Sequence, residues 1–432
     1  MTTPSYDVIV AGVGSMGAAA CYHLSKRGQR VLGIEQFAIP HEKGAHAGQS
    51  RIIRRAYFEH PDYVPLLQLA YDNWRQLEQA CGEQLYFPVG LLYSGKPNHP
   101  IISGVQQSAA LYHIPLTGLH KKDVAERYPV FSIPDDHAVL WEPEAGFVRP
   151  ERTIRLLADQ AISQGAVIQT GEKMTGWKQD GPRLRVRTDK GEYDCKRLVI
   201  TAGPWSEYLL PRIKSLLRVT RQLVAWVKPE QPERFSPGNF PCWMIADEEK
   251  QGCFYGFPFL EADAFGPPGG LKLAHHFPGA VFDTNEPKRE PQAGEWEDVS
   301  YALGRYFPGI AMERLAAKVC LYTNTPDEHF IIDHVPDTRG QVIMACGFSG
   351  HGFKFVPAVG EILADLAITG GNPQTTTLGT AFATSLGVQV TSSYTEQVGA
   401  GGVITFTPPA SGAGLNVTFD NVESDSTAKE SA

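Results

Sequence analysis

The sequence predicts an α/β protein in which a nucleotide-binding domain is assembled from separate stretches of the chain, with a second domain of mixed α+β structure inserted between them. Three observations support this prediction. An apolar strand at the N-terminus runs into a glycine-rich turn and a helix. A meander of three strands is expected over residues 174–201. Near residue 342 another apolar strand runs into a second glycine-rich turn and a helix.

The N-terminal unit contains the turn GVGSMG. Gly12 permits the tight turn out of the strand, Gly14 lets the backbone approach a pyrophosphate closely, and Gly17 lets the helix pack against the sheet. The free N–H groups at the start of the helix, at Ser15 and Met16, and the positive end of its dipole favour a phosphate. The unit therefore predicts a dinucleotide site; an incidental glycine turn is the alternative.

Glu35 ends the next strand, 18 residues after Gly17. A carboxylate there can accept hydrogen bonds from a ribose, which favours FAD or NAD over NADP. The helix, strand and meander over residues 151–201 are expected of FAD enzymes with a split nucleotide domain, whereas nicotinamide dehydrogenases usually lack the meander. In such a domain the small-residue turn at Ala202 and Gly203 passes close to the cofactor.

Composition excludes several classes of protein. A chain of 432 residues, 42% of them hydrophobic, is long enough for about two or three domains. A formal charge of −8 with no basic run argues against nucleic acid as a partner. No stretch approaches the roughly 18 apolar residues of a membrane helix, and the first strand begins too early for a signal peptide. Seven widely spaced cysteines form neither a disulfide framework nor a metal site, so we expect a cytoplasmic protein without a metal.

Two further stretches carry unusual charges. Residues 40–63 contain Arg51, Arg54 and Arg55 in an acidic protein. From spacing alone a solvated loop is favoured, and a site for an anionic cofactor or a carboxylate is the alternative. Lys272 stands in an otherwise apolar strand, where a buried lysine costs several kcal/mol unless it is paired. The pattern leaves a structural and a functional role for it equally open.

These stretches together resemble the monomeric sarcosine oxidase family, which includes N-methyltryptophan oxidase and pipecolate oxidase. The resemblance covers residues 6–370, roughly 85% of the chain, and GQSRIIR with CLYTNTPDE is most similar to the pipecolate-type branch. It is carried by GVGSMG, GQSRIIRRAY, ITAGPW, YGFP, LKLAHH, CLYTNTPDEHFIID and GFSGHGFKF.

The resemblance implies a glutathione-reductase-type split FAD-binding domain and a second, mixed-sheet substrate domain. The FAD-binding domain would comprise residues 1–88, 148–215 and 318–372, and the substrate domain residues 89–147 and 216–317. FAD would be attached by a thioether from Cys320 to the 8α-methyl of its ring. Besides the N-terminal turn and Glu35, the implied cofactor contacts are Ser50, Arg51, Ala202, Gly203, Gly347, Gly350, Gly352 and Lys354.

The resemblance also implies a substrate and a reaction. Arg54 and Lys354 would bind a substrate carboxylate, and Tyr255, His276 and Tyr322 would line the pocket. A secondary amino acid, N-methyl or cyclic, would be oxidised to an imine while O2 is reduced to H2O2, so that sarcosine gives glycine and formaldehyde. L-Pipecolate, N-methyltryptophan and glycated amino acids are alternative substrates. A flavin-binding protein without turnover is the alternative from another class.

Two cations have separate implied roles, and two features depart from the family. Arg51 would stabilise the reduced flavin, and Lys272 would activate O2. Ala47 stands where sarcosine oxidases carry a second histidine. Residues 373–432 form an atypical polar tail with a sequon at Asn416, for which no function is predicted. A monomer is expected.

Overall fold

The N-terminal unit forms the centre of the first sheet. In the computed structural model, which describes residues 4–277, 279–285 and 289–369, β1 (Ser5–Ala11) pairs in parallel with β2 (Val31–Glu35) and with β12 (Glu192–Ile200). Parallel β9 (Val167–Thr170) and β19 (Val342–Cys346) extend the sheet. Antiparallel partners complete it, namely β10 (Met174–Asp180), β11 (Arg183–Thr188) and β18 (Ile331–His334). The predicted N-terminal unit and meander are confirmed.

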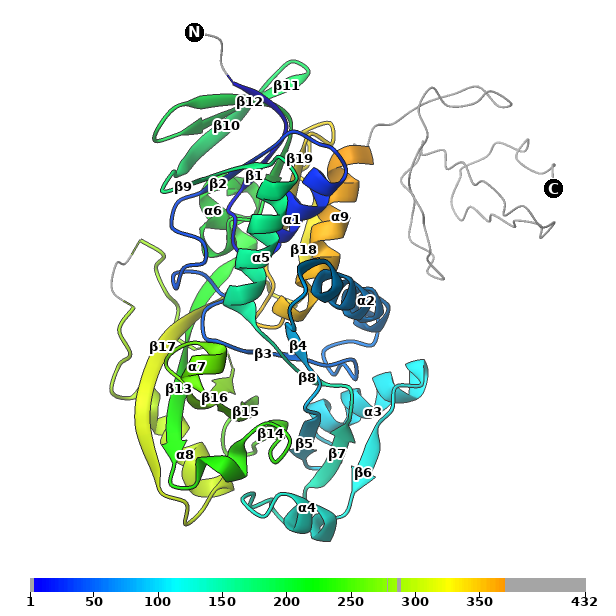
Figure 1. Cartoon of the computed structure of the whole chain (residues 1–432), viewed down its shortest axis with the longest axis vertical. Helices are drawn as coiled ribbons and strands as arrows, with labels where there is room; N and C mark the ends of the chain where they lie inside the picture. The colour runs from blue at the N-terminus through cyan, green and yellow to red at the C-terminus, as the bar shows by residue number, and fades with distance from the viewer. Residues whose placement is uncertain (1–3, 278, 286–288, 370–432) are drawn as a thin grey trace, which may run out of the picture.

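Helices cover one face of this sheet (Figure 1). Helix α1 (Ser15–Lys26) packs against both α5 (Pro150–Ser163) and α9 (Val356–Thr369), and α2 (Tyr63–Cys81) packs on α9. Buried alanines dominate the middle of α1, so its backbone can approach α9 closely. The short helices of this part of the chain are Gly203–Trp205, α6 (Ser206–Leu209), Pro211–Leu216 and Phe353–Phe355.

The second sheet lies at the other end of the molecule (Figure 1). Its strand order is β17-β13-β16-β15-β14-β5-β7-β6, and only the β14–β5 pair is parallel, so the predicted mixed sheet is confirmed. The strands are β17 (Met312–Asn324), β13 (Arg218–Pro229), β16 (Gly270–His276), β15 (Cys253–Leu260), β14 (Cys242–Ala246), β5 (Leu91–Gly95), β7 (Ala138–Glu142) and β6 (Thr117–Leu119). The helices of this part are α3 (Pro100–Tyr112), α4 (Lys121–Arg127), Pro232–Phe235, α7 (Ala262–Phe265) and α8 (Glu295–Tyr306).

A small third sheet joins the two halves. It consists of β3 (Arg51–Ile53), β8 (Gly146–Val148) and β4 (Tyr86–Phe87). The strands of the first sheet come from the three segments assigned to the FAD-binding domain, and most strands of the second come from the two assigned to the substrate domain. Strand β17, however, pairs with β13 on both sides of residue 318, so the predicted boundary falls inside a continuous strand. The division into domains stays a prediction.

The interpretation of residues 40–63 as a solvated loop is wrong. Ser50 is 0% exposed, Arg54 is 2% exposed and Tyr57 is 0% exposed. The segment is polar because its side chains and backbone bind buried partners rather than water. Arg54 pairs with Glu59, and the backbone N–H of Arg55 donates to a buried carboxylate of β7.

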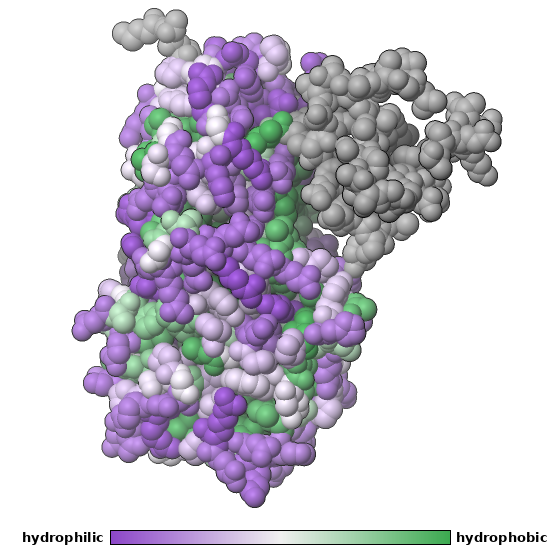
Figure 2. Space-filling model, turned by 45° about the vertical axis from the view of Figure 1, so that its right-hand side comes forward, coloured by the Kyte–Doolittle hydropathy of each residue, from purple (hydrophilic) through white to green (hydrophobic). Residues whose placement is uncertain are grey.

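The outer face of the described part of the chain is largely polar (Figure 2). The surface drawn in Figure 2 is mostly hydrophilic, with apolar side chains scattered between polar ones. Among the described helices, none combines the length and the apolar character needed to cross a bilayer. The predicted polar tail and the sequon at Asn416 lie outside the described residues.

The contact between α1 and α9 yields the first testable prediction. A Cβ added to Gly360 would lie 2.4 Å from the Cβ of Ala19 on α1, so Gly360→Ala should push two helices apart. We expect a loss of about 1–3 kcal/mol in the free energy of unfolding, measured by urea titration. Gly304→Ala in α8 is the control, because its Cβ would meet no atom within 4 Å. There alanine should stabilise the helix by up to about 1 kcal/mol. An equal response of both variants would contradict close helix packing.

Candidate active site

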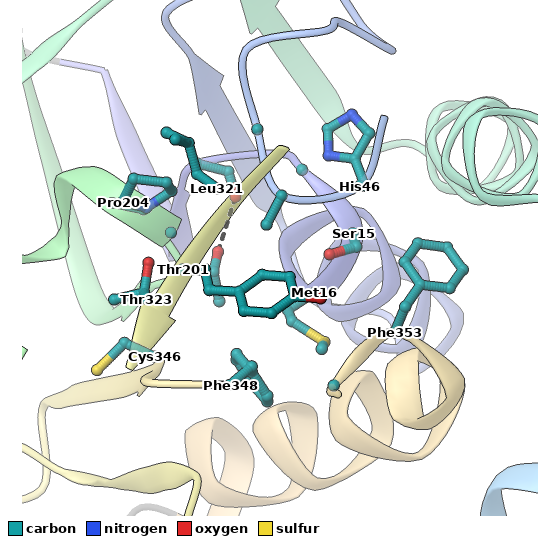
Figure 3. A pocket seen from close by; sticks show the side chains of 18 of the residues that line it. Ser15, Met16, His46, Thr201, Pro204, Leu321, Thr323, Cys346, Phe348 and Phe353 are labelled. Carbon is teal, nitrogen blue, oxygen red and sulfur yellow. Dashed lines mark hydrogen bonds between the residues drawn. The ribbon is translucent and has the colours of Figure 1, made fainter. Parts of the chain in front are cut away.

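A large cavity opens where the first sheet meets the second (Figure 3). From the first sheet, its wall contains both glycine-rich turns, the end of β2 and the turn after β12. The loop before β3 and the ends of β15, β16 and β17 form the rest. Figure 3 shows Ser15, Met16, Thr201, Cys346 and Phe348 around the open space. Stretches far apart in the sequence therefore line one site.

The N-terminal turn has the shape that the motif predicts. Gly12 has a φ of +89°, and a Cβ there would lie 2.6 Å from the carbonyl oxygen of Thr201. A Cβ on Gly17 would lie 1.8 Å from the carbonyl oxygen of Gly12, so Gly17 serves helix packing and does not line the cavity. A Cβ on Gly14 would meet only the Nδ1 of His46, at 3.9 Å. The open cradle at Gly14 fits a pyrophosphate.

Glu35 stands in the cavity wall at the end of β2. Its carboxylate accepts hydrogen bonds from the backbone N–H groups of Val13 and Phe37, both at 2.9 Å, and burial raises its pKa. His46 also lines the cavity, and its buried Nε2 has no hydrogen-bond partner among the described residues. A carboxylate at the strand end and an unsatisfied donor or acceptor in the wall fit a dinucleotide such as FAD.

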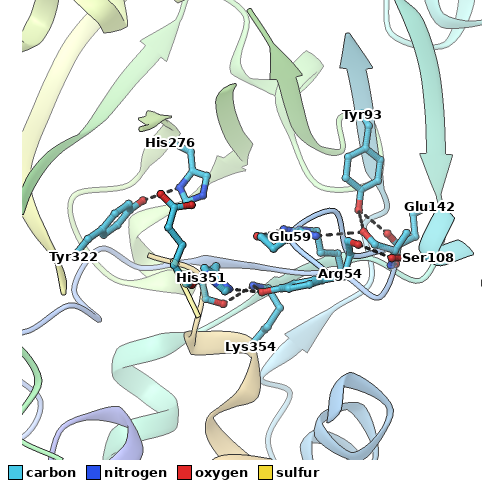
Figure 4. Close-up of polar contacts among 12 residues, drawn as sticks. Arg54, Glu59, Tyr93, Ser108, Glu142, His276, Tyr322, His351 and Lys354 are labelled. Atoms are coloured by element: carbon cyan, nitrogen blue, oxygen red, sulfur yellow. Dashed lines mark hydrogen bonds and ion pairs between the residues drawn. The ribbon is translucent and has the colours of Figure 1, made fainter. Parts of the chain in front are cut away.

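Arg54 lies in the part of the cavity that Figure 4 shows. Its Nη2 binds both carboxylate oxygens of Glu59, at 2.6 and 2.7 Å, and its guanidinium stacks on the rings of Tyr57 and Phe58. Burial alone would raise the pKa of Glu59, but Arg54, His351 and Lys354 outweigh burial and lower that pKa to about 2. Glu59 is therefore an anion at neutral pH, held against the arginine.

Lys354 approaches the same region from the second glycine-rich turn. Its Nζ donates to the carbonyl oxygen of His351 at 2.6 Å and to the hydroxyl of Tyr57 at 3.4 Å. Burial, followed by the charge of Arg54, lowers the pKa of Lys354 to about 7. The ammonium is thus readily deprotonated unless an anion stabilises it.

Three further residues with ring side chains, Tyr255, His276 and Tyr322, line the cavity. The Nδ1 of His276 is 3.1 Å from the hydroxyl of Tyr322, and Tyr255 lines the cavity beside them. Burial lowers the pKa of His276 to about 4 and raises the pKa of Tyr255 to about 12. All three side chains are therefore uncharged at neutral pH. They give this end of the cavity an apolar character with a few hydrogen-bonding atoms.

Arg51 and Cys320 lie together in the wall. Arg51 donates to the carbonyl oxygens of Ala47 at 2.6 Å and Ser50 at 2.8 Å, and its Nη2 is 3.5 Å from the Sγ of Cys320. Burial disfavours the charge of Arg51, but Cys320 and other neighbours raise its pKa above the ordinary arginine value. A guanidinium beside this sulfur stabilises negative charge on it.

The structure brings all the predicted site residues to the cavity wall except Gly17, Ser50 and Lys272. Lys272 is 0% exposed and lies behind the loop before β3. Its Nζ donates to the carbonyl oxygens of Gly48 and Ser50, and the ring of Phe257 lies 4.4 Å from it. The predicted contacts with cofactor and substrate stay predictions for every residue.

Sequence reasoning missed Glu59 and two histidines, His46 and His351, which all line the cavity. Glu59 follows Arg54 by five residues, and that short spacing was the available signal for an ion pair. His351 lies within the second glycine-rich turn, in which only the glycines and Lys354 were assigned a role from the sequence. Its Nδ1 bonds to the hydroxyl of Tyr57, next to Lys354.

Comparisons with known proteins agree with this site. The model of a family described as "FAD dependent oxidoreductase" matches residues 7–366. A monomeric sarcosine oxidase of Streptomyces avermitilis is 39% identical over 85% of this chain and 95% of its own length. An N-methyl-L-tryptophan oxidase of Yersinia pestis is 34% identical over 83% of this chain and 94% of its own.

Solved structures agree as well. NikD, described as an unusual amino acid oxidase essential for nikkomycin biosynthesis, superposes with a TM-score of 0.73 at 25% identity, over 85% of this chain and 94% of its own. A glycine oxidase from Geobacillus kaustophilus gives a TM-score of 0.69 at 21% identity, over 85% and 95%. The second likeness supports the fold alone.

The lowered pKa of Lys354 predicts a pH dependence of stability. Unfolding returns the pKa from about 7 to 10.5, so between these values the unfolded chain binds the extra proton. The penalty of burying the ammonium is therefore complete below pH 7 and falls as the pH rises, by at most about 1.4 kcal/mol per pH unit. Lys354→Met should be more stable than the wild type at pH 7, with a smaller advantage at pH 9.5 in urea titrations. Lys122→Met, at an exposed lysine of α4, is the control. An advantage of Lys354→Met that does not change with pH would contradict the shift.

Proposed function

The chain belongs to the FAD dependent oxidoreductase family, and from this premise we propose that it oxidises a secondary amino acid, N-methyl or cyclic, to an imine, with O2 reduced to H2O2. Sarcosine would give glycine and formaldehyde. The observation that carries the proposal is the meeting, in one cavity, of a glycine cradle suited to a dinucleotide and a pair of cations, Arg54 and Lys354.

FAD, when bound, would supply the capacity to accept a hydride from the C–H bond beside the amine nitrogen, which loses its proton as the C=N bond forms, and to pass the two electrons to O2. Its phosphates would be held by the turn Gly12–Gly17 and its adenosine ribose by Glu35. Ala202, Gly203 and the second glycine-rich turn would contact the rest of the cofactor. Supporting this assignment, the cradle at Gly14 is open and the carboxylate of Glu35 stands in the same wall.

Arg54 and Lys354 bind the substrate carboxylate. The guanidinium of Arg54 already binds a carboxylate, because its Nη2 contacts both oxygens of Glu59. A substrate carboxylate would compete with Glu59 for Arg54. Its charge would also favour the protonated form of Lys354, which burial otherwise disfavours.

The ring side chains hold the amine. Oxidation requires an uncharged amine, because a protonated nitrogen has no lone pair to stabilise the developing imine. Tyr255, His276 and Tyr322 are themselves uncharged, so they offer no anion that would keep the amine protonated. Removal from water and the nearby guanidinium of Arg51 both lower the pKa of the amine. The cavity thus prepares a zwitterion for oxidation.

L-Pipecolate, N-methyltryptophan and glycated amino acids are the alternative substrates to sarcosine. A second candidate function, flavin binding without turnover, is disfavoured because Arg54, Lys272, Cys320 and Lys354 are all present. The monomeric state and the cytoplasmic location stay predictions.

A substrate panel tests the proposed function. Purified protein with its flavin is incubated with sarcosine, L-pipecolate, L-proline and N-methyl-L-tryptophan, and peroxide is measured with a peroxidase-coupled dye. Catalase added before the dye is the control. We expect peroxide from at least one of the four amino acids. Flavin-containing protein that produces none from any of them would favour the binding protein without turnover.

Cys320 is proposed to carry the flavin as an 8α thioether. Its sulfur stands in the cavity wall, 3.5 Å from the Nη2 of Arg51. Cys346 also lines the cavity, but burial raises the pKa of its thiol to about 12. The cavity therefore contains one cysteine suited to the link and one matched comparison.

Cys320→Ser should release the flavin under conditions that leave it attached to the wild type. Trichloroacetic acid precipitates the protein, and the yellow colour is then measured in pellet and supernatant. We expect the colour in the pellet for the wild type and for Cys346→Ser, and in the supernatant for Cys320→Ser. Colour that stays in the Cys320→Ser pellet would place the attachment at another residue.

A further inference from the structure

The turn Gly48–Ser50 separates two charges of opposite sign. On one side the N–H groups of Gly48 and Gln49 donate to the carboxylate of Glu151, at 2.6 and 3.1 Å. On the other side the carbonyl oxygens of Gly48 and Ser50 accept from the Nζ of Lys272, at 2.6 Å for Gly48. The peptide group between Gly48 and Gln49 thus turns its positive end to the carboxylate and its negative end to the ammonium.

The turn is held in an unusual conformation. Gly48 has a φ of +116° and Gln49 a φ of +69°, which is uncommon for a residue with a side chain. The side chain of Gln49 is fixed at both ends, by the Nε1 of Trp226 at 3.0 Å and the carbonyl oxygen of Gly266 at 2.6 Å. The backbone N–H groups of Gly48 and Gln49 donate to Glu151, and the N–H of Ser50 donates to the carbonyl oxygen of Gly48 at 2.8 Å. Glu151 is therefore part of what fixes the turn.

Lys272 needs a counter-charge that its direct contacts do not supply. Neither it nor Arg51 has a carboxylate oxygen within 4.0 Å in the part of the chain that the structure describes. The titratable groups facing Lys272 are Arg51 from β3, Glu151 from α5, Cys320 from β17 and Cys242 from β14. Burial and Arg51 lower the pKa of Lys272 well below the ordinary lysine value, and Glu151 leads the groups that oppose this shift. Glu151 is the carboxylate of this set.

Glu151 reaches the turn from the start of a helix. It lies in the first turn of α5, which begins at Pro150, so the positive end of the helix dipole favours its carboxylate. It is half-buried, whereas Lys272 is fully buried. From the rim of the core the carboxylate of Glu151 faces the lysine across one ordered peptide group, which carries the N–H of Gln49 and the carbonyl of Gly48.

We propose that Glu151 is a positioning residue that fixes the turn Gly48–Ser50 and, through the dipole of the Gly48–Gln49 peptide, stabilises the protonated form of Lys272 beside the flavin cavity. The consequence for oxygen rests on the proposed function, in which Lys272 activates O2. Since only a charged lysine stabilises developing superoxide, loss of the Glu151 charge should narrow the pH range of rapid flavin reoxidation.

The test measures the titration of Lys272 in the holoenzyme. Lysine is labelled with ¹³C at Cε, and the signal of Lys272 is identified by its absence in Lys272→Met. Glu151→Gln keeps the size and one accepting oxygen but removes the charge, so the titration midpoint of Lys272 should fall by about 1 pH unit. Glu151→Asp keeps the charge and should leave the midpoint near that of the wild type. An unchanged midpoint in Glu151→Gln would overturn the proposal.

Glu83→Gln is the matched control, because Glu83 binds Arg149 and Arg152 at the start of the same helix without touching the turn. Its midpoint should equal that of the wild type, and a shift as large as in Glu151→Gln would overturn a specific role for Glu151. If Glu151→Gln does not fold, the double variant with Lys272→Met decides. Recovery of folded protein would support the counter-charge, and continued misfolding would contradict the counter-charge and leave Glu151 a purely structural residue of the turn.

Stopped-flow kinetics then connects the charge to oxygen. Reoxidation of the reduced enzyme by O2 should lose its rate at a lower pH in Glu151→Gln, by the same shift as the NMR midpoint, while anaerobic reduction by substrate keeps its pH profile. A reoxidation profile identical to that of the wild type would contradict the proposal. An enzyme that oxidises none of the amino acids would refute the proposed function, while the NMR midpoint would still decide the role of Glu151.

Discussion

The burial of positive charge is the constraint on which this site depends. Lys272, Arg54 and Lys354 are all nearly or fully inaccessible to water, and an isolated buried cation costs many kcal/mol. Each is compensated differently. Arg54 has a direct carboxylate partner, Lys354 has a carbonyl and a hydroxyl, and Lys272 has two carbonyls of one turn. Buried basic groups therefore stand in or behind the wall where a carboxylate and an electron-rich ring are expected.

Strand β3 is the element through which these charges reach the cavity. Arg51 begins the strand and Arg54 follows it, and carboxylates hold the backbone at both ends. Glu151 accepts from the N–H groups before the strand, and Glu142 accepts from those of Arg55 and Ala56 after it. Because Glu142 lies on β7 and Glu151 on α5, both halves of the molecule contribute to placing one short strand. The orientation of the two arginines is thus a tertiary property.

The sequence predicted those parts of the site that depend only on residues close together in the chain. The roles of Gly12, Gly14 and Gly17 follow from the mechanics of one turn, and the structure contains that turn as expected. The segment 40–63 was misread because a polar, glycine-rich composition normally indicates exposure. The carboxylates that bind the backbone of this segment, Glu142 and Glu151, come roughly 90 residues later or more. Nothing in the sequence around either glutamate indicates that it contacts this segment. Contacts within the second glycine-rich turn, such as that of His351, were equally invisible because they depend on a partner in another segment.

Compensation of this kind also shapes what the cavity can accept. Arg54 and Glu59 together are neutral, and Lys354 with a pKa of about 7 carries only part of a charge at neutral pH. An anion that enters this region therefore meets a guanidinium that must first exchange one carboxylate for another, and a lysine that gains a proton as the anion arrives. A neutral ligand would supply neither a replacement for Glu59 nor the charge that stabilises Lys354. Selection for a carboxylate thus arises from the exchange of partners among buried charges, and apolar contacts with Tyr255 and Tyr322 are left to distinguish one amino acid from another.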